Sequence, residues 1–310
     1  MNNNIQLKSI RDGFGEAIFE LAKKDRNILV LSADLSPSLR VDRIRSEIPD
    51  QFIECGVAEQ NMVSLASGLA LSGKVPFVTS FAEFLVGRAW EQIRIDVCYN
   101  NANVKLIGSH GGLATGPDGA THQILEDLSL MRTLPNMTVI SPCDANEAYK
   151  ATFQASKIKT PCYIRLSRPK TPNLTKTDSF FEIGKINVLK EGNDVAIFAT
   201  GPSVYEAIEA SNEIEKEGKK VAVLNVHTLK PLDKKTILEF SKKVKMVVTV
   251  EDHQIIGGLG SAIAETLSEN GLGIPIKRMG VNNVFGESGE HQELWKKHGI
   301  DKEGILKILK

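Results

Sequence analysis

Short apolar runs alternate with amphipathic helical patterns along most of the sequence. In the first part of the chain these runs have the length and composition of buried parallel strands. They lie at 27–33, 52–57, 75–80, 103–108, 137–140 and 162–166. Between them apolar residues recur at helical spacing, as Ile10, Phe14 and Ile18 do within 9–24. Strands that alternate with helices predict an α/β fold with a doubly wound parallel sheet.

The alternation is interrupted once, at 167–181, where prolines and threonines gather without periodicity. It then restarts with apolar runs and helical patterns in turn, at 195–198, 204–216, 221–226, 234–241, 246–250 and 260–269. A chain of 310 residues is long enough to bury two cores. We therefore predict a first domain at 1–170, a linker at 171–186, and a smaller α/β domain at 187–310.

Charge and cysteine content narrow the class of protein. The 38 basic residues balance 38 acidic ones, so there is no basic field for nucleic acid or an anionic membrane. No apolar run approaches the roughly 20 residues that span a bilayer, and the polar N-terminus does not resemble a signal peptide. The four cysteines are scattered without a C-x-x-C pair. These features predict a cytoplasmic protein with reduced thiols.

The most distinctive stretch is the glycine-rich segment 109–123, SHGGLATGPDGATHQ. An apolar run leads into it, and a helical pattern from about Gln123 leads out. This order is typical of a site at the carboxyl edge of a parallel sheet. His110, Asp118 and His122 lie within the segment, but two histidines without a third ligand do not predict a metal site. As proton carriers or phosphate donors the histidines are more plausible.

Other candidates have an ordinary explanation beside a functional one. Glu59 follows an apolar run and precedes a helical pattern of small residues over 60–71, so it is either a proton relay or a first-turn glutamate favoured by the helix dipole. Phe81 and Phe84 could stack on a flat ring or simply fill the core. Arg11 and Arg168 would ordinarily be solvent-exposed charges, yet either guanidinium could bind a phosphate through two hydrogen bonds.

A second glycine-rich stretch, Gly257 to Ser261, follows a strand and an acidic pair and opens a helix. It could hold an anion at the helix N-terminus. Because it does not fit G-x-G-x-x-G, close packing of helix on strand explains it better.

Taken together, these residues resemble the C-terminal half of a transketolase, a thiamine diphosphate enzyme, and most closely the small subunit of forms split into two chains. The segment FIECGVAEQNMVSLASGLAL resembles the stretch that carries the family's cofactor-activating glutamate, which falls on Glu59. Three further segments follow the family's motifs in order: DLSPS at 34–38 resembles D-L-T-P-S, SFAEF at 80–84 resembles T-F-x-x-F, and the segment at 110–122 matches H-x(7)-D-G-x-T-H. The resemblance covers essentially the whole chain.

The resemblance implies a role for each matched residue. Glu59 would hydrogen-bond the cofactor's pyrimidine N1′, with His122 near the cofactor's amino nitrogen and the donor hydroxyls. Phe84 would stack on the aminopyrimidine, with Phe81 beside it, and Asp34 would lie near the cofactor. The substrate residues form a second group, in which Asp118 would read a hydroxyl and four others would hold the phosphate: Arg11, Ser38, His110 and Arg168.

Two departures from the family pattern affect the prediction. The chain has no G-D-G-x(n)-N-N motif, which in the family holds the metal and the diphosphate. We therefore expect a separate large subunit to bring the Mg²⁺ (or Ca²⁺) and the diphosphate site, in an α2β2 assembly that acts on sugar phosphates. The family's His-Asp-Ser-Ile-Gly is also replaced by the sequence at 110–114, HGGLA, which bears on substrate details.

The resemblance implies transfer of a two-carbon ketol unit from a ketose phosphate to an aldose phosphate. Three alternatives remain: a 1-deoxyxylulose-5-phosphate synthase-like carboligase, the β subunit of a 2-oxoacid dehydrogenase, and a scaffold subunit without catalysis. The first is normally one long chain. The second is not expected to carry D-G-x-T-H together with the phosphate arginines, and intact Glu59, His110 and His122 argue against the third.

Overall fold

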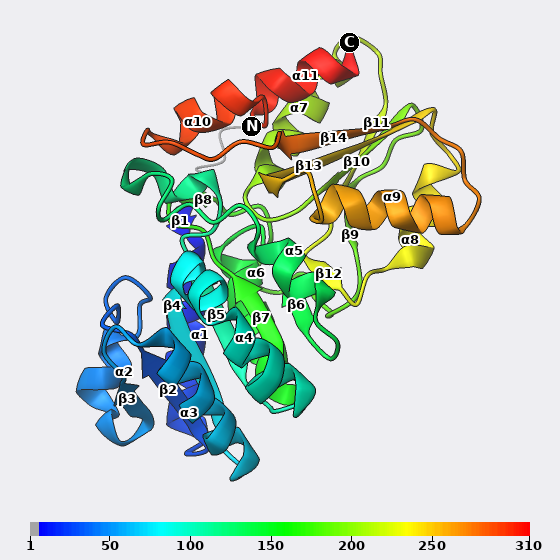
Figure 1. Ribbon diagram of the computed structural model, residues 1–310. Helices are drawn as coiled ribbons and strands as arrows, with labels where there is room; N and C mark the ends of the chain where they lie inside the picture. Colours follow the sequence, from blue (N-terminus) through cyan, green and yellow to red (C-terminus); the bar gives the residue numbers. More distant parts are fainter. Residues whose placement is uncertain (1–5) are drawn as a thin grey trace.

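Two main β-sheets, each flanked by helices, organise the chain (Figure 1). The computed structural model describes residues 6–310. The larger sheet has the strand order β12-β6-β7-β5-β4-β2-β3, and the smaller one has the order β14-β13-β10-β11-β9. Helices lie on both sides of each sheet, so the predicted α/β architecture is confirmed.

Most strands of the larger sheet coincide with the apolar runs of the first part of the sequence. They are β2 (Ile28–Ser32), β3 (Phe52–Glu54), β4 (Val75–Phe81), β5 (Lys105–Ser109), β6 (Thr138–Ile140), β7 (Cys162–Arg165) and β12 (Thr228–Lys230). All pair in parallel except β12, which is antiparallel to β6. Alternate residues of a strand face opposite sides. Accordingly Leu29 and Leu31 join one core, whereas Ile28 and Val30 join the other.

Helices cover both faces of this sheet. One face carries α3 (Glu59–Leu71), a helical stretch over 83–99 that includes the short α4 (Trp90–Gln92), and α5 (Asp127–Thr133). The other carries α1 (Ile10–Lys24) and α6 (Ala145–Lys157). These two helices touch closely, because a Cβ on Gly13 of α1 would lie 1.9 Å from the carbonyl oxygen of Ala145. Glycine is therefore required where the two helices meet.

The smaller sheet lies farther along the chain, in the C-terminal half. Its strands are β9 (Asn187–Lys190), β10 (Val195–Ala199), β11 (Val221–Asn225), β13 (Met246–Gln254) and β14 (Ile276–Val281), with β9 antiparallel to β11. One face packs on α7 (Ser203–Glu215) and α11 (Lys302–Leu309). The other packs on α8 (Lys234–Ser241) and α9 (Leu259–Glu269), in a core continuous with that of the larger sheet.

Four further elements lie outside the two main sheets and their covering helices. A two-stranded antiparallel ladder pairs β1 (Leu7–Ser9) with β8 (Lys170–Pro172), so part of the irregular stretch after β7 is tied to the first residues described. The short α2 (Asp42–Glu47) follows the 34–38 turn, and α10 (His291–His298) lies against the glycine-rich segment. No helix in 6–310 combines the length and apolar character needed to cross a bilayer.

Several elements differ from the predictions. The helix expected from about Gln123 begins only at Asp127, because Ile124 forms an isolated bridge with Gly111 and accepts a hydrogen bond from the Gly112 N–H at 2.9 Å. The strand expected over 52–57 stops at Glu54, where Gly56 turns the chain with φ of +66°. The sequence patterns also did not reveal β12, which adds a strand from the C-terminal half to the larger sheet.

Candidate active site

A buried carboxylate lies at the N-terminus of α3, beside the end of strand β4. Glu59 is 1 % exposed, and its Oε1 accepts a hydrogen bond from the hydroxyl of Ser80 at 3.2 Å. Its Oε2 pairs with the guanidinium of Arg88 at 2.5 Å. A carboxylate with few partners in a buried position is a strong hydrogen-bond acceptor for a bound group. The helix predicted over 60–71 is observed as α3, which begins one residue earlier, at Glu59 itself.

An aromatic cluster adjoins this carboxylate. The rings of Phe81 and Phe84 are nearly parallel, with centroids 6.0 Å apart. The ring of His122 meets Phe84 edge-on at 5.2 Å, and the ring of His110 lies 3.8 Å from Phe81. The guanidinium of Arg88 lies 4.7 Å from the centre of Phe84, so it links the ring to Glu59. Phe81 is buried in the core, whereas Phe84 is only partly covered.

The glycine-rich segment 109–123 follows β5 and brings two predicted histidines to this cluster. His110 has a left-handed backbone with φ of +59°, and its Nδ1 lies 2.8 Å from the hydroxyl of Ser109. Burial, together with the positive charges of Arg11 and Arg168, lowers the pKa of His110 to about 2. The imidazole is therefore neutral at physiological pH, and it offers one donor and one acceptor rather than a charge.

Two guanidinium groups stand beside His110. Arg11 Nη1 donates to the carbonyl of Ser38 at 2.8 Å and lies 3.5 Å from His110 Nε2. Arg168 Nη1 donates to the carbonyl of Thr115 at 2.7 Å and lies 3.4 Å from Asp118. Burial and the neighbouring Arg40 lower the pKa of Arg11 to about 10, so it keeps its charge. The two charges are positioned to bind an anion.

A cavity of about 330 Å³ opens between these arginines and the C-terminal half of the chain. Arg11 and Arg168 line one side, and Glu290 and His291 at the start of α10 line the other. His291 was not among the predicted residues, since no sequence signal connects it with Arg11, which is far away along the chain. His291 reaches the cavity only because the C-terminal half of the chain packs against the first half.

The structure brings most of the predicted residues together but leaves one apart. Arg11, Ser38, His110, Asp118 and Arg168 form a connected group, and Glu59, Phe81, Phe84 and His122 form a second that meets it at His110. Among the contacts within residues 6–310, none joins the exposed Asp34 side chain to either group; its backbone N–H donates to Glu54 at 2.8 Å. Arg88 was missed, although it follows Phe84 by one helical turn.

The arrangement combines a buried hydrogen-bonding carboxylate, a partly covered aromatic face and a cationic pocket. Such a site can hold a flat polar heterocycle and place an anionic ligand next to it. Within residues 6–310, no group of three or more histidine, cysteine or acidic side chains is arranged to hold a metal ion.

Comparison with known protein families accounts for both halves of the chain. Residues 7–173 match the transketolase pyrimidine-binding domain, and residues 184–305 match the transketolase C-terminal domain. A putative transketolase C-terminal section of Methanocaldococcus jannaschii is 44 % identical over 97 % of this chain and 95 % of its own length. An apulose-4-phosphate transketolase subunit of Phocaeicola vulgatus is 37 % identical over 99 % and 97 % of the two lengths.

A solved structure agrees with these matches. A protein described as split gene transketolase, inactive beta4 tetramer, superposes with a TM-score of 0.90 at 42 % identity, covering 96 % of each chain. The expected resemblance is thus confirmed over nearly the full length. The chain belongs to the transketolase family, and it contains that family's pyrimidine-binding and C-terminal domains.

Proposed function

We propose that this chain is the small subunit of a two-chain, thiamine diphosphate-dependent transketolase. It would transfer a two-carbon ketol unit from a ketose phosphate to an aldose phosphate. The observation that carries the proposal is the buried Glu59 carboxylate at the start of α3, with a partly covered Phe84 ring and His122 beside it.

The residues present fit the cofactor's aminopyrimidine. Glu59 is buried and its side-chain partners are Ser80 and Arg88, so a carboxylate oxygen can accept a hydrogen bond from a ring nitrogen. Phe84 supplies a face on which the ring can lie, and Phe81 supports it from the core. When bound, the cofactor supplies the nucleophilic carbon and the electron sink for breaking and forming the carbon–carbon bond.

The chain's own residues would orient the reactants and move protons. Glu59 holds the pyrimidine nitrogen, and His122 donates or accepts a proton near the donor hydroxyls. Arg11 and Arg168 bind the phosphate at the far end of the sugar, and Asp118 recognises a hydroxyl. His110 takes part as a neutral donor, because its pKa is about 2. Fixing the sugar at both ends favours reaction through orientation.

A second subunit completes the proposed site. The sequence has no G-D-G motif, and the relatives that match end to end are named as a section or a subunit of a transketolase. The face that carries α3 exposes large apolar side chains, with Val57 just before Glu59 69 % exposed and Leu65 on the helix 40 % exposed. We infer a large subunit that covers this face and holds Mg²⁺ (or Ca²⁺) and the diphosphate, in an α2β2 assembly in the cytoplasm. Asp34, whose side chain contacts neither group of site residues in the described part of this chain, would lie near the cofactor only in that assembly. The assignment of residues 171–186 as the linker between the two domains is part of the same proposal.

Substitution of Glu59 tests the cofactor role. Glu59→Gln in the assembled enzyme should lower turnover on the order of a hundred-fold or more, because a positioned proton-transfer group contributes about that much. Glu147→Gln is the matched control. Glu147 is also a fully buried glutamate in the first turn of a helix, where it accepts hydrogen bonds from the Cys143 N–H and the Asn225 amide. Normal turnover in Glu59→Gln would remove the basis of the proposal.

A further inference from the structure

One carboxylate from the C-terminal half of the chain binds two backbone amides of the glycine-rich segment. Asp252, near the end of β13, is 1 % exposed. Its Oδ1 accepts the backbone N–H of Leu113 at 2.9 Å, and its Oδ2 accepts that of Ala114 at 3.0 Å. Both oxygens are therefore used on two successive amides at the start of the helical turn 113–118.

This contact is closely fitted. Gly112 has φ of +82°, and a Cβ built on it would lie 2.4 Å from Asp252 Oδ2. A side chain at this position would therefore meet the carboxylate as well as strain the backbone. Leu294 and Trp295 of α10 pack on Leu113 and Ala114 in one small buried cluster. The segment thus rests against the C-terminal half through both polar and apolar contacts.

The contact reaches the proposed phosphate site through the next residue. The backbone N–H of Thr115 donates to the carbonyl of Gly112 at 3.3 Å, which closes the turn, and the Thr115 hydroxyl donates to the carbonyl of His110. The carbonyl of Thr115 accepts a hydrogen bond from Arg168 Nη1 at 2.7 Å, and the same guanidinium contacts Asp118. The position of Thr115 therefore fixes where the Arg168 charge lies in the cavity.

We propose that Asp252 is a positioning residue for the substrate side of the site. It holds the 113–118 turn against the C-terminal half, and the turn in turn aims Arg168 and Asp118. This assigns to the C-terminal domain a direct part in shaping the anion pocket. The effect on substrate binding rests on the proposed function, whereas the effect on the turn does not.

A neutral amide at position 252 cannot replace the carboxylate. One of its two polar atoms would be an NH₂ group facing a backbone N–H, so one of the amides of Leu113 and Ala114 would lose its acceptor. Burial raises the pKa of Asp252, and the nearby charge of Arg165 together with the two backbone N–H donors opposes this rise. A buried backbone N–H without a partner is costly, so the turn should open more often in Asp252→Asn.

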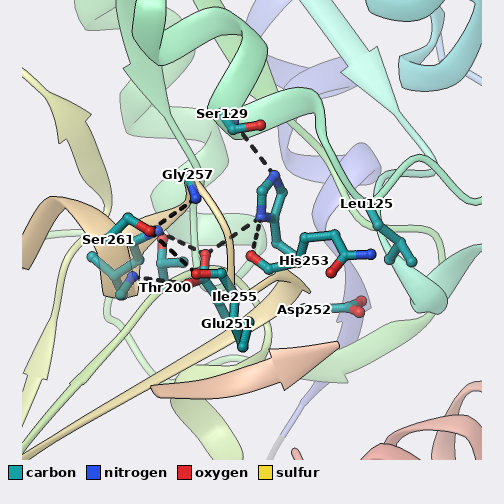
Figure 2. A network of polar contacts seen from close by, with 12 residues as sticks. Leu125, Ser129, Thr200, Glu251, Asp252, His253, Ile255, Gly257 and Ser261 are labelled. Atoms are coloured by element: carbon teal, nitrogen blue, oxygen red, sulfur yellow. Dashed lines mark hydrogen bonds and ion pairs between the residues drawn. The ribbon is translucent and has the colours of Figure 1, made fainter. Parts of the chain in front are cut away.

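The neighbouring Glu251 provides a matched control. Figure 2 shows Glu251 and Asp252 as consecutive side chains on β13 that point to different sides. Glu251 is also fully buried and accepts two backbone N–H groups, those of Leu259 at 2.7 Å and Gly260 at 2.8 Å. The backbone amides at the start of α9, where a bound anion was one of two interpretations of the sequence, are therefore occupied by the carboxylate of Glu251. Glu251→Gln removes the same kind of contact from α9 and leaves the 113–118 turn intact.

Hydrogen–deuterium exchange on the full chain tests the proposal without requiring activity. In Asp252→Asn the peptide covering 109–125 should exchange about ten- to a hundred-fold faster than in the wild type, with 257–262 unchanged. In Glu251→Gln the reverse should hold. If Asp252→Asn does not fold, Gly112→Ala approaches the same contact from the other side and should release the same peptide. An unchanged 109–125 peptide in the folded variant would overturn the proposal, as would release of both peptides in both variants.

Kinetics of the assembled enzyme test the functional part separately. Asp252→Asn should raise KM for the phosphorylated ketose about ten-fold or more, whereas Glu251→Gln should not. An increase of equal size in both variants would refute the positioning role. A wild-type assembly that performs no ketol transfer would count against the proposed function alone, because the exchange result stands or falls independently.

Discussion

The buried imidazole of His110 leads to a prediction about stability and pH. An exposed histidine has a pKa near 6.5, whereas that of His110 is lowered to about 2 by burial and by the adjacent arginines. The unfolded chain therefore binds a proton at this residue between these two values and the folded chain does not. Because the unfolded state binds more protons, the stability provided by His110 falls as the pH falls below about 6.5.

The size of the effect at moderate acidity does not depend on the exact folded value. Each pH unit below the unfolded pKa costs about 1.4 kcal/mol, so lowering the pH from 8 to 5 should remove about 2 kcal/mol through this residue. His110→Asn removes the titrating group, and asparagine tolerates the positive φ found there. The variant should be less stable at pH 8, because the contact with Phe81 is lost. It should also lose about 2 kcal/mol less on acidification.

Denaturant unfolding of both proteins at pH 8 and pH 5 measures this difference. The remaining titrating groups are common to the two proteins, so they cancel to first order. Carbon-13 histidine spectra offer a direct check, since the His110 signal, identified by its absence in the variant, should not shift between pH 8 and pH 5. Equal losses of stability in the two proteins, or a His110 signal that titrates near pH 6.5, would refute the reasoning.

Two further substitutions test other parts of the account. Arg168→Gln should raise KM for a phosphorylated ketose about ten- to a hundred-fold in the assembled enzyme, because the charge beside the cavity is lost. KM for the unphosphorylated sugar should change little. Equal changes for both sugars would contradict a phosphate role. Asp127→Asn should destabilise the fold by about 3–5 kcal/mol, since Arg165 is buried with its Nε 2.9 Å from the Asp127 carboxylate. Thermal unfolding measures this loss. A variant that unfolds at the wild-type midpoint temperature would show that the ion pair does not stabilise the fold.

The fold was largely predictable because its buried parallel strands are apolar runs that stand out from the helices between them. The helix α3, observed to begin one residue before its predicted start, and the strand before the glycine-rich segment follow from this pattern. The short β12 did not, because three residues carry little periodicity and its partner β6 lies far back in the sequence. The delayed start of α5 also escaped prediction, since a bridge between Gly111 and Ile124 leaves no periodic signal.

In the candidate site, too, residues close together in the sequence were predictable, whereas those brought together by long-range packing were not. Residues within one motif, such as His110 and His122, were identified from the sequence and meet the same aromatic ring, Phe81. Asp252 and His291 were not identified, because their positions depend on packing between segments more than a hundred residues apart. The stretch from Gly257 to Ser261 was open to two interpretations. The structure shows that the carboxylate of Glu251, eight residues before Leu259, meets the amides there.

The central claim is that this chain forms only part of an active site. Ketol transfer should be measured with the chain alone, and then with a purified large subunit carrying the G-D-G motif, thiamine diphosphate and Mg²⁺. The account predicts no transfer by the chain alone and transfer at enzymatic rates when all components are present. Full activity of the chain alone with the cofactor and Mg²⁺ would contradict it.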